Sequence, residues 1–183
     1  MARICLLTGL PGTGKTTIIR KAISQSHLRA GGFYTQEIRI AGKRQGFSIV
    51  TLDGQNAILA HIDSPGPNRV SKYGVDIAQL DSVGVAALYR AISRSDVVVV
   101  DEIGKMELFS PQFREAVKAA LESDKKVLGT IMYGPSSFTD DIKQHPAVEI
   151  LEVTRENRNQ ILHKVLEWLN KNDENHYQTN RHS

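Results

Sequence analysis

The segment GLPGTGKT, residues 9–16, constrains the fold of this chain more than any other feature, because it fits the pattern G-x-x-x-x-G-K-[ST]. The run ARICLLT precedes it at residues 2–8, and KTTIIRKAISQ follows at residues 15–25 with apolar side chains at helical spacing. A glycine-rich turn between a strand and a helix presents backbone N–H groups to a chain of phosphates. The sequence therefore predicts a phosphate-binding loop in an α/β domain.

The residue types of this loop have distinct physical purposes. Side chains at its glycine positions would block the close approach of phosphates, whereas Lys15 is long enough to reach β- and γ-phosphate oxygens. The hydroxyl of Thr16 is a suitable ligand for Mg²⁺. We expect a nucleotide to contact the whole loop, that is Gly9, Leu10, Pro11, Gly12, Thr13, Gly14, Lys15, Thr16 and Thr17.

A second constraint is the segment VVVVDE, residues 97–102, in which a buried strand ends in two carboxylates. A phosphate loop of this kind needs a carboxylate at the end of a neighbouring strand to hold Mg²⁺, and Asp101 fits that position. Glu102 is a candidate general base for an attacking water. Because successive strand residues point to opposite faces, both acids share one site only if the chain turns at Glu102, and Gly104 favours such a turn.

Two more residues near these strand ends are candidates. Lys105 would place a positive charge against the transferring phosphoryl group, the alternative being an ordinary exposed lysine. Thr130 ends the run VLGT, where its hydroxyl would sense the γ-phosphate or hold the water, the alternative being simple strand packing.

The order of the remaining elements predicts a three-layer α/β fold with a mainly parallel sheet covered on both faces. Further strands are expected at residues 31–40, 44–53, 56–62, 96–100, 125–132 and 148–153, and helices at residues 81–93, 110–123 and 155–170. An antiparallel hairpin insertion is expected around residues 32–60, and a loop at residues 63–73. We predict one domain over residues 1–170 and a polar, flexible tail over residues 171–183.

The composition of the 183 residues excludes several classes of protein. No run approaches the length of a membrane span, and the single cysteine, Cys5, allows neither a disulfide framework nor a Cys/His metal cluster. The net charge of +3 suits an anionic ligand, but there is no strong nucleic-acid signal, because Lys and Arg do not cluster with aromatic residues. We expect a cytoplasmic protein, and no motif identifies a protein partner.

The segments DEIG and NKND, at residues 101–104 and 170–173, imitate the switch and guanine-reading motifs of GTPases. Guanine reading requires the second motif at a strand end that faces the base. Here it follows a predicted helix, so we interpret NKND as coincidental.

The segments GLPGTGKTT, GGFYTQEIR, GKRQGFSIV, RVSKYGVD, DEIGKMELFS and VTRENRN occur in this order. The series resembles the cancer-related or thermophile-type nucleoside-triphosphatases over roughly residues 3–169. The resemblance implies a small P-loop protein that slowly hydrolyses ATP, GTP and other nucleoside triphosphates with Mg²⁺, giving diphosphate and phosphate. It also implies that Asn157 and Arg158 border the nucleotide base. Ser71 departs from the pattern, since glycine is expected there.

Two alternative functions use the same loop. A kinase would pass the γ-phosphoryl group to a small acceptor, for which Arg39, Lys43 and Arg44 on the predicted hairpin are the nearest candidates. A nucleotide-dependent switch would move the segment DSPGPNRV, residues 63–70, or the hairpin. No residue pattern selects one base, so we expect broad base specificity.

Overall fold

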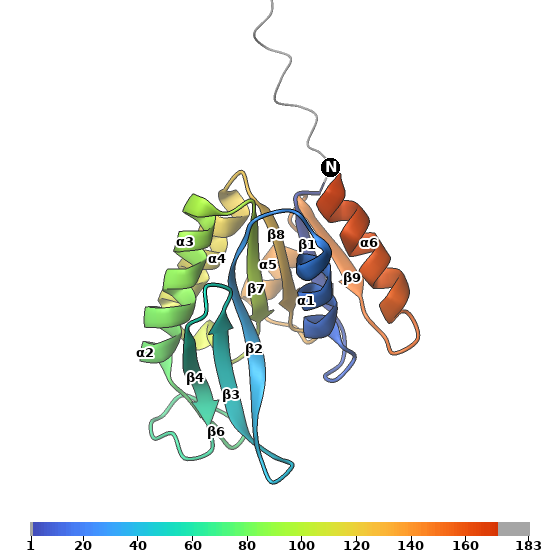
Figure 1. Cartoon of the computed structure of the whole chain (residues 1–183). Helices are drawn as coiled ribbons and strands as arrows, with labels where there is room; N and C mark the ends of the chain where they lie inside the picture. The colour runs from blue at the N-terminus through green and yellow to red at the C-terminus, as the bar shows by residue number, and fades with distance from the viewer. Residues whose placement is uncertain (1, 172–183) are drawn as a thin grey trace, which may run out of the picture.

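The computed structural model describes residues 2–171, which form one nine-stranded sheet with helices on both faces (Figure 1). The sheet order is β5-β6-β4-β3-β2-β7-β8-β1-β9. The strands are β1 (Ile4–Thr8), β2 (Ala30–Ile40), β3 (Lys43–Thr51), β4 (Asn56–His61), β5 (Arg69–Val70), β6 (Tyr73–Val75), β7 (Val97–Ile103), β8 (Lys126–Ile131) and β9 (Val148–Glu152). The predicted α/β fold is confirmed, and all but Lys171 of the predicted polar tail lies outside the described residues.

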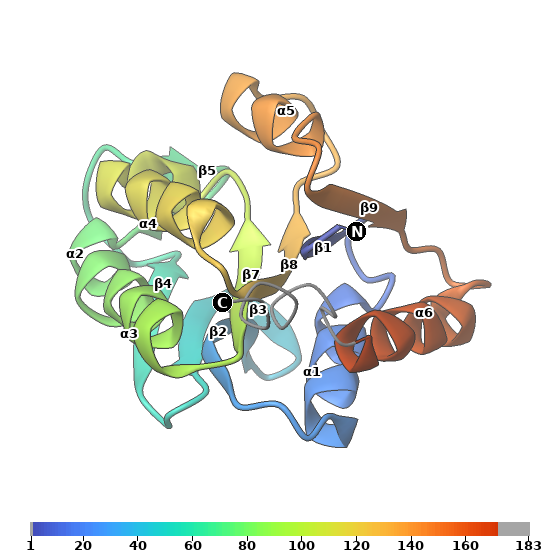
Figure 2. The same ribbon diagram turned by 90° about the horizontal axis from the view of Figure 1, so that it is seen from above.

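The helices alternate with the parallel strands as expected. They are α1 (Lys15–Gln25), α2 (Ile77–Gln79), the π-helical segment η1 (Leu80–Val85), α3 (Ala86–Arg94), the 3₁₀ segment η2 (Glu107–Phe109), α4 (Pro111–Glu122), α5 (Ser137–Lys143) and α6 (Arg158–Asn170). Seen from above, α1 and α6 cover one face of the sheet, and α3 and α4 cover the other (Figure 2). None of the helices within residues 2–171 has both the length and the apolar character that crossing a bilayer requires.

Strand β2 joins the two halves of the sheet. Its first residues, Ala30–Phe33, pair in parallel with β7, and Phe33–Ile40 pair antiparallel with β3. The predicted hairpin is therefore a continuation of the same sheet. Because β2 is longer than β7, the β2–β3 hairpin extends past the carboxyl ends of the parallel strands (Figure 1).

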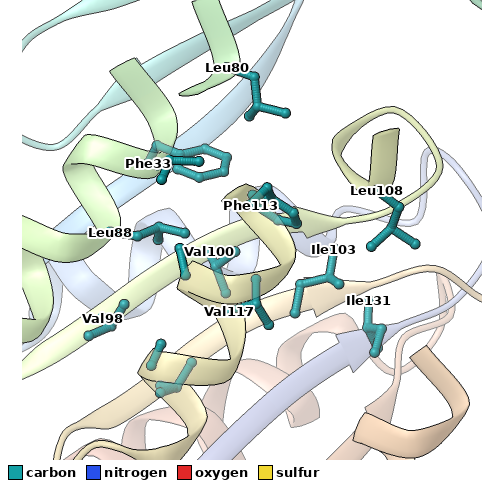
Figure 3. Close-up of a cluster of buried hydrophobic side chains, with 14 of the residues drawn as sticks. Phe33, Leu80, Leu88, Val98, Val100, Ile103, Leu108, Phe113, Val117 and Ile131 are labelled. Atoms are coloured by element: carbon teal, nitrogen blue, oxygen red, sulfur yellow. The ribbon is translucent and has the colours of Figure 1, made fainter. Parts of the chain in front are cut away.

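The valine run of β7 shows how the sheet is buried on both faces. Val98 and Val100 pack with α3 and α4 in one hydrophobic cluster, whereas Val97 and Val99 pack with α1 and α6 in a second cluster. All four valines are buried, as strand alternation between two covered faces requires. Figure 3 shows part of the first cluster, which includes Phe33 and Phe113. The ring centroids of these two residues lie 6.4 Å apart.

Local signals in the sequence set several helix ends. Ser110 caps α4, since its hydroxyl accepts a hydrogen bond from the backbone N–H of Phe113 at 2.9 Å, and Pro111 occupies the first helical position. The helix predicted at residues 81–93 instead begins at Ile77, where Asp76 supplies the cap, and passes through the π-helical segment into α3. Helix α5 was not predicted.

The structure also bears on the predicted loop at residues 63–73 and on Cys5. The predicted loop contains the short strand β5 and leads directly into β6, and these two strands pair with each other. Cys5 is fully buried, and burial, with the nearby charge of Glu149, raises the pKa of its thiol to about 12. The thiol is therefore a packing group of the second cluster.

Ser71 forms the turn between β5 and β6 with a φ of 55°, in the left-handed region that favours glycine. We predict that Ser71→Gly raises the free energy of unfolding by about 1 kcal/mol, measured by chemical denaturation. Ser93→Gly, within α3, is the control and should lower stability, because glycine weakens helices. A lower unfolding midpoint for Ser71→Gly would contradict this account.

Candidate active site

The candidate site lies at the carboxyl ends of the parallel strands, where ligands of open α/β sheets bind. Strand β1 pairs with β8 on one side and β9 on the other, so the loop of residues 9–16, here called the phosphate loop, starts between the ends of these two strands. Strand β7 ends beside β8, which brings Asp101 and Glu102 to the same edge. The β2–β3 hairpin flanks the site (Figure 1).

The phosphate loop depends on glycine at two positions. Gly9 has a φ of 141°, and a Cβ atom there would lie 2.4 Å from the backbone oxygen of Val153. Gly14, the residue before α1, has a φ of 97°. Both positions therefore resist any side chain, and the loop turns tightly enough to direct the first N–H groups of α1 at a bound anion.

Lys15 is positioned by the loop itself. Its ammonium donates hydrogen bonds to the backbone oxygens of Gly9 and Leu10, both at 2.9 Å. An ammonium group has three N–H donors, so one remains for a phosphate oxygen. The hydroxyl of Thr13 donates to the backbone oxygen of Leu10 at 2.9 Å and braces the same turn.

Asp101 connects the phosphate loop to two strand ends. Its Oδ2 accepts a hydrogen bond from the hydroxyl of Thr16 at 2.7 Å, and its Oδ1 accepts one from the hydroxyl of Thr130 at 2.6 Å. Burial raises the pKa of the Asp101 carboxyl, while both hydroxyls, the backbone of Thr35 and the charge of Lys15 oppose this rise. Thr130 thus orients the carboxylate, a contact that the sequence did not indicate.

The donors around Asp101 fit a divalent cation. Asp101 is only 1% exposed, and none of the described Lys, Arg or His side chains forms an ion pair with it. A buried carboxylate oxygen beside a hydroxyl oxygen is the hard ligand set that Mg²⁺ prefers. The predicted metal ligands, Thr16 and Asp101, are therefore together in the structure.

A β-bulge explains how two successive acids share one site. Between Val100 and Ile103, β7 advances three residues while the facing strand β8 advances only from Gly129 to Ile131. The extra residue breaks the strict alternation of side chains at Asp101 and Glu102. The sequence predicts a change of direction at Glu102, and the structure makes it as a bulge within β7.

Glu102 lies over Gly104 and beside the phosphate loop. A Cβ atom on Gly104 would lie 3.1 Å from the Cδ atom of Glu102, so glycine leaves room for that carboxyl group. Burial and the charge of Asp101 raise the pKa of Glu102, and Lys15 partly offsets the rise. A half-buried carboxyl group with a raised pKa suits a general base.

Glu107 is a third acid at this site, and no pattern in the sequence indicates it. It is 3% exposed, and burial together with the charges of Glu102 and Asp101 raises its pKa well above the usual range. Only the 3₁₀ turn after β7 brings Glu107 back toward the strand, which explains why its sequence position gave no signal. Burial and the two neighbouring acids therefore favour the neutral form of the Glu107 carboxyl group.

Two cavities flank the phosphate loop. The Glu102 cavity, of about 400 Å³, lies between the loop and the β3–β4 part of the sheet, with Lys15, Glu102 and Glu107 among its lining residues. The Thr154 cavity, of about 440 Å³, lies between the loop and the connection from β9 to α6, and Leu10, Pro11 and Thr154 line it. Tyr133 lines both cavities and was not predicted as a site residue.

The remaining predicted site residues differ in their surroundings. Lys105 is exposed and lines the Glu102 cavity. Arg158 lies beside the loop, since a Cβ atom on Gly14 would lie 3.1 Å from its Cδ atom. Asn157 instead holds the connection before α6, because it accepts from the N–H of Thr154 at 2.8 Å and donates to the oxygen of Glu152 at 2.9 Å. Thr17 is an exposed residue of the first turn of α1.

Neither the hairpin cations nor the NKND segment reaches the site within the described chain. Arg39 and Arg44 form ion pairs with Glu37 at 2.7 and 3.3 Å on the hairpin. Neither these arginines nor Lys43 lines a cavity beside the phosphate loop. Asn170 is the last residue of α6, and Asn172 and Asp173 lie outside the described residues.

Comparison with known proteins gives consistent results. Residues 4–166 match a family model described as NTPase. The chain is 48% identical over 161 residues to the nucleoside-triphosphatase THEP1 of Thermotoga sp. (strain RQ2), covering 88% of this chain and 92% of that protein. It is 39% identical over 182 residues to the human cancer-related nucleoside-triphosphatase, covering 91% and 96%. The crystal structure of THEP1 from Aquifex aeolicus superimposes with a TM-score of 0.85 at 33% identity, covering 92% and 99%.

The buried acid Glu107 yields a prediction about pH and stability. Folding raises the pKa of Glu107. The stability that the protonated Glu107 carboxyl contributes is therefore complete below its unfolded pKa of about 4.5, and it is lost as the pH rises through the folded pKa. Glu107→Gln cannot ionise and should therefore gain stability over the wild type as the pH is raised from 4 to 8.

Urea unfolding of the metal-free and nucleotide-free protein across this pH range is the measurement. Glu115→Gln, at an exposed position on α4, is the control and should show a nearly constant difference from the wild type. Parallel pH profiles for wild type and Glu107→Gln would show that Glu107 is not held neutral by the fold.

Proposed function

The chain belongs to the NTPase family, and from this premise we propose that it hydrolyses nucleoside triphosphates with Mg²⁺, slowly and with broad base specificity, to nucleoside diphosphate and phosphate. The observation that carries the proposal is the contact between the phosphate loop and the acid-bearing strand. Thr16 and Asp101, 85 residues apart, are hydrogen-bonded at 2.7 Å, with Glu102 next in the chain.

The phosphate loop accounts for triphosphate binding. Its backbone N–H groups and the amino end of α1 complement the negative charge of the phosphates. Lys15, held by two backbone oxygens, adds a fixed positive charge near the β- and γ-phosphates. Because the loop backbone and the Lys15 side chain are already held in place, little side-chain entropy is lost when the triphosphate binds.

Thr16 and Asp101 are the residues that would hold Mg²⁺, and the ion, when bound, neutralises charge on the phosphate oxygens. The chain fixes the donors before the ion arrives, since Thr130 orients one oxygen of Asp101 and Thr16 contacts the other. Because Asp101 is buried and forms no ion pair with any described cationic side chain, its carboxylate attracts a metal cation strongly.

Glu102 is the proposed general base. Its carboxylate takes a proton from the attacking water, the water oxygen bonds to the γ-phosphorus, and the bond to the bridging oxygen breaks, which releases diphosphate. Lys105, at the edge of the same cavity, is placed to offset negative charge on the transferring group. The bulge in β7 is what allows Asp101 and Glu102 to serve the metal and the water separately.

The Thr154 cavity is the proposed base site. Tyr133 and Pro11 offer flat surfaces for stacking, which does not distinguish between bases. The side chain of Asn157 is already hydrogen-bonded to backbone groups at both ends, so it supports the cavity wall and leaves little capacity for reading a base. This arrangement supports broad base specificity, with Arg158 beside the loop.

The direct test is Glu102→Gln. We expect nucleotide binding to be retained and phosphate release to fall by about 10²-fold, because the amide cannot accept the proton. Phosphate release should be followed with a panel of nucleoside triphosphates, alongside binding of a Mg-nucleotide analogue. Glu122→Gln at the end of α4 is the control with normal turnover, and Lys15→Ala is the variant that loses binding. Full turnover in Glu102→Gln would refute the role of this residue.

Gly104→Ala tests the positioning of Glu102. The added methyl group would displace the Glu102 carboxyl, so turnover should fall roughly ten- to a hundredfold with little change in nucleotide affinity. In the double variant with Glu102→Gln, the alanine should have almost no additional effect on turnover, because both changes act through one carboxyl group. Independent, multiplying effects would show that Gly104 acts elsewhere.

A further inference from the structure

The Glu102 cavity is larger and less polar than hydrolysis requires. Its volume is about 400 Å³, whereas one water occupies roughly 30 Å³ in the liquid. The phosphate loop forms one wall through Gly9, Pro11 and Lys15. Much of the remaining lining is apolar and comes from β3, β4, β5 and the segments that follow β7 and β8, namely Phe47, Leu59, Val70, Met106 and Met132. Apolar side chains do not stabilise a bound water molecule, but they do stabilise the apolar body of an organic molecule.

A second hollow adjoins this cavity. It has a volume of about 490 Å³, and it shares Val70, Lys105 and Met132 with the Glu102 cavity. We call it the cationic pocket, because Arg69, Lys105 and Arg114 line it and no acidic residue does. A ligand that spans both hollows would pass beside Lys105.

The two arginines of the cationic pocket are fixed in place without being neutralised. Arg69 donates to the backbone oxygens of Ser64 and Lys72, and Arg114 donates to the backbone oxygen of Leu108 at 2.9 Å. Among residues 2–171, no carboxylate lies within ion-pair distance of Arg69, Lys105 or Arg114. Other arginines of the described chain do have such partners, at Asp96, Glu37 and Asp53.

An anionic group is the ligand that this arrangement favours. Guanidinium groups bind carboxylates and phosphates through paired N–H donors, and here two of them are held by backbone oxygens that carry no full charge. The adjoining apolar lining selects for a hydrophobic body attached to the anion. The Glu102 carboxyl, which lines the Glu102 cavity and not the cationic pocket, selects for a proton donor such as a hydroxyl group.

We propose that the Glu102 cavity and the cationic pocket form a second substrate site, for a hydroxyl compound with an apolar body and one anionic group. This compound accepts the γ-phosphoryl group in place of water. The inference rests on the proposed function, since the donor is the triphosphate in the phosphate loop. The hairpin residues Arg39 and Arg44 have no part in it, because they pair with Glu37.

The transfer step is balanced within the site. The hydroxyl oxygen of the acceptor bonds to the γ-phosphorus, and its proton passes to the Glu102 carboxylate. The bond between the γ-phosphorus and the bridging oxygen breaks, and its electron pair leaves with the diphosphate. The products are a phosphomonoester and a nucleoside diphosphate. Water uses the same base when the second site holds no acceptor.

The experiment incubates the full chain with Mg-ATP and follows the products by ³¹P NMR. The acceptor probes are 4-(hydroxymethyl)benzoate, 4-(hydroxymethyl)phenylacetate and 4-(hydroxymethyl)phenyl phosphate, which combine a hydroxyl, an aromatic body and an anion. Benzyl alcohol, which lacks the anion, is the matched control. We expect a new phosphomonoester from at least one of the anionic probes and far less from benzyl alcohol at equal concentration. 4-Methylbenzoate, which lacks the hydroxyl, should compete.

Variants connect the transfer to the cationic pocket. Arg69→Gln and Arg114→Gln should each raise the acceptor KM by about tenfold or more, since each removes a charged donor. Arg69→Lys and Arg114→Lys keep the charge and should retain most acceptor binding, which separates loss of charge from loss of folding. Arg94→Gln, on α3 and away from both hollows, is the control that leaves the acceptor KM unchanged.

The outcomes separate this inference from the proposed function. If ATP is neither bound nor hydrolysed, the proposed function fails. If ATP is hydrolysed but no probe yields a phosphomonoester, the second substrate site is overturned and the hydrolase stands. The same holds if a probe changes only the rate of hydrolysis. An acceptor KM that is unchanged in both glutamine variants would overturn the assignment of the anion to the cationic pocket.

Discussion

The hydrogen bonds of Asp101 to Thr16 and Thr130 are the interaction on which the site depends. They connect the phosphate loop after β1 with the ends of β7 and β8, three segments that are far apart in the chain. A buried carboxylate that lost one of these partners would keep its desolvation cost without compensation. The parallel register of β1, β8 and β7 is what places the three groups at one level of the sheet, so sheet packing and site geometry are a single constraint.

The second constraint is the concentration of acids around that carboxylate. Burial raises the pKa of all three carboxyl groups, the charge of Asp101 adds to the rise at Glu102, and both of these acids add to the rise at Glu107. A fold selected for stability alone would not gather three carboxyl groups in this way. The loss of stability from grouping these acids is explained if a cation and a proton-accepting base are both needed at the end of β7. Lys15 opposes the shift at Glu102 and at Asp101, which links the acids electrostatically to the phosphate loop.

Local patterns predicted the parts of the site that depend on short stretches of sequence. The phosphate loop, the valine run of β7, the hairpin and the cap of α4 by Ser110 all follow from adjacent residues, and the structure contains each of these elements. Other features depend on contacts between distant segments and left no such pattern. The bulge in β7 exists only relative to β8, and the link between Thr130 and Asp101 needs both strands in register. Glu107 and Tyr133 reach the site through turns, where side-chain direction has no fixed period.

The antiparallel half of the sheet explains why this site has space that a phosphate loop alone would not create. Strand β2 begins as a parallel neighbour of β7 and continues past it, so β3 and β4 stand beside the strand ends and not behind them. Thr35, Phe47 and Leu59 reach the Glu102 cavity from these strands. A sheet that ended with β7 would leave Glu102 open to solvent. Because the extension lines the cavity beside Glu102 with apolar side chains, it defines what else can lie next to the γ-phosphate.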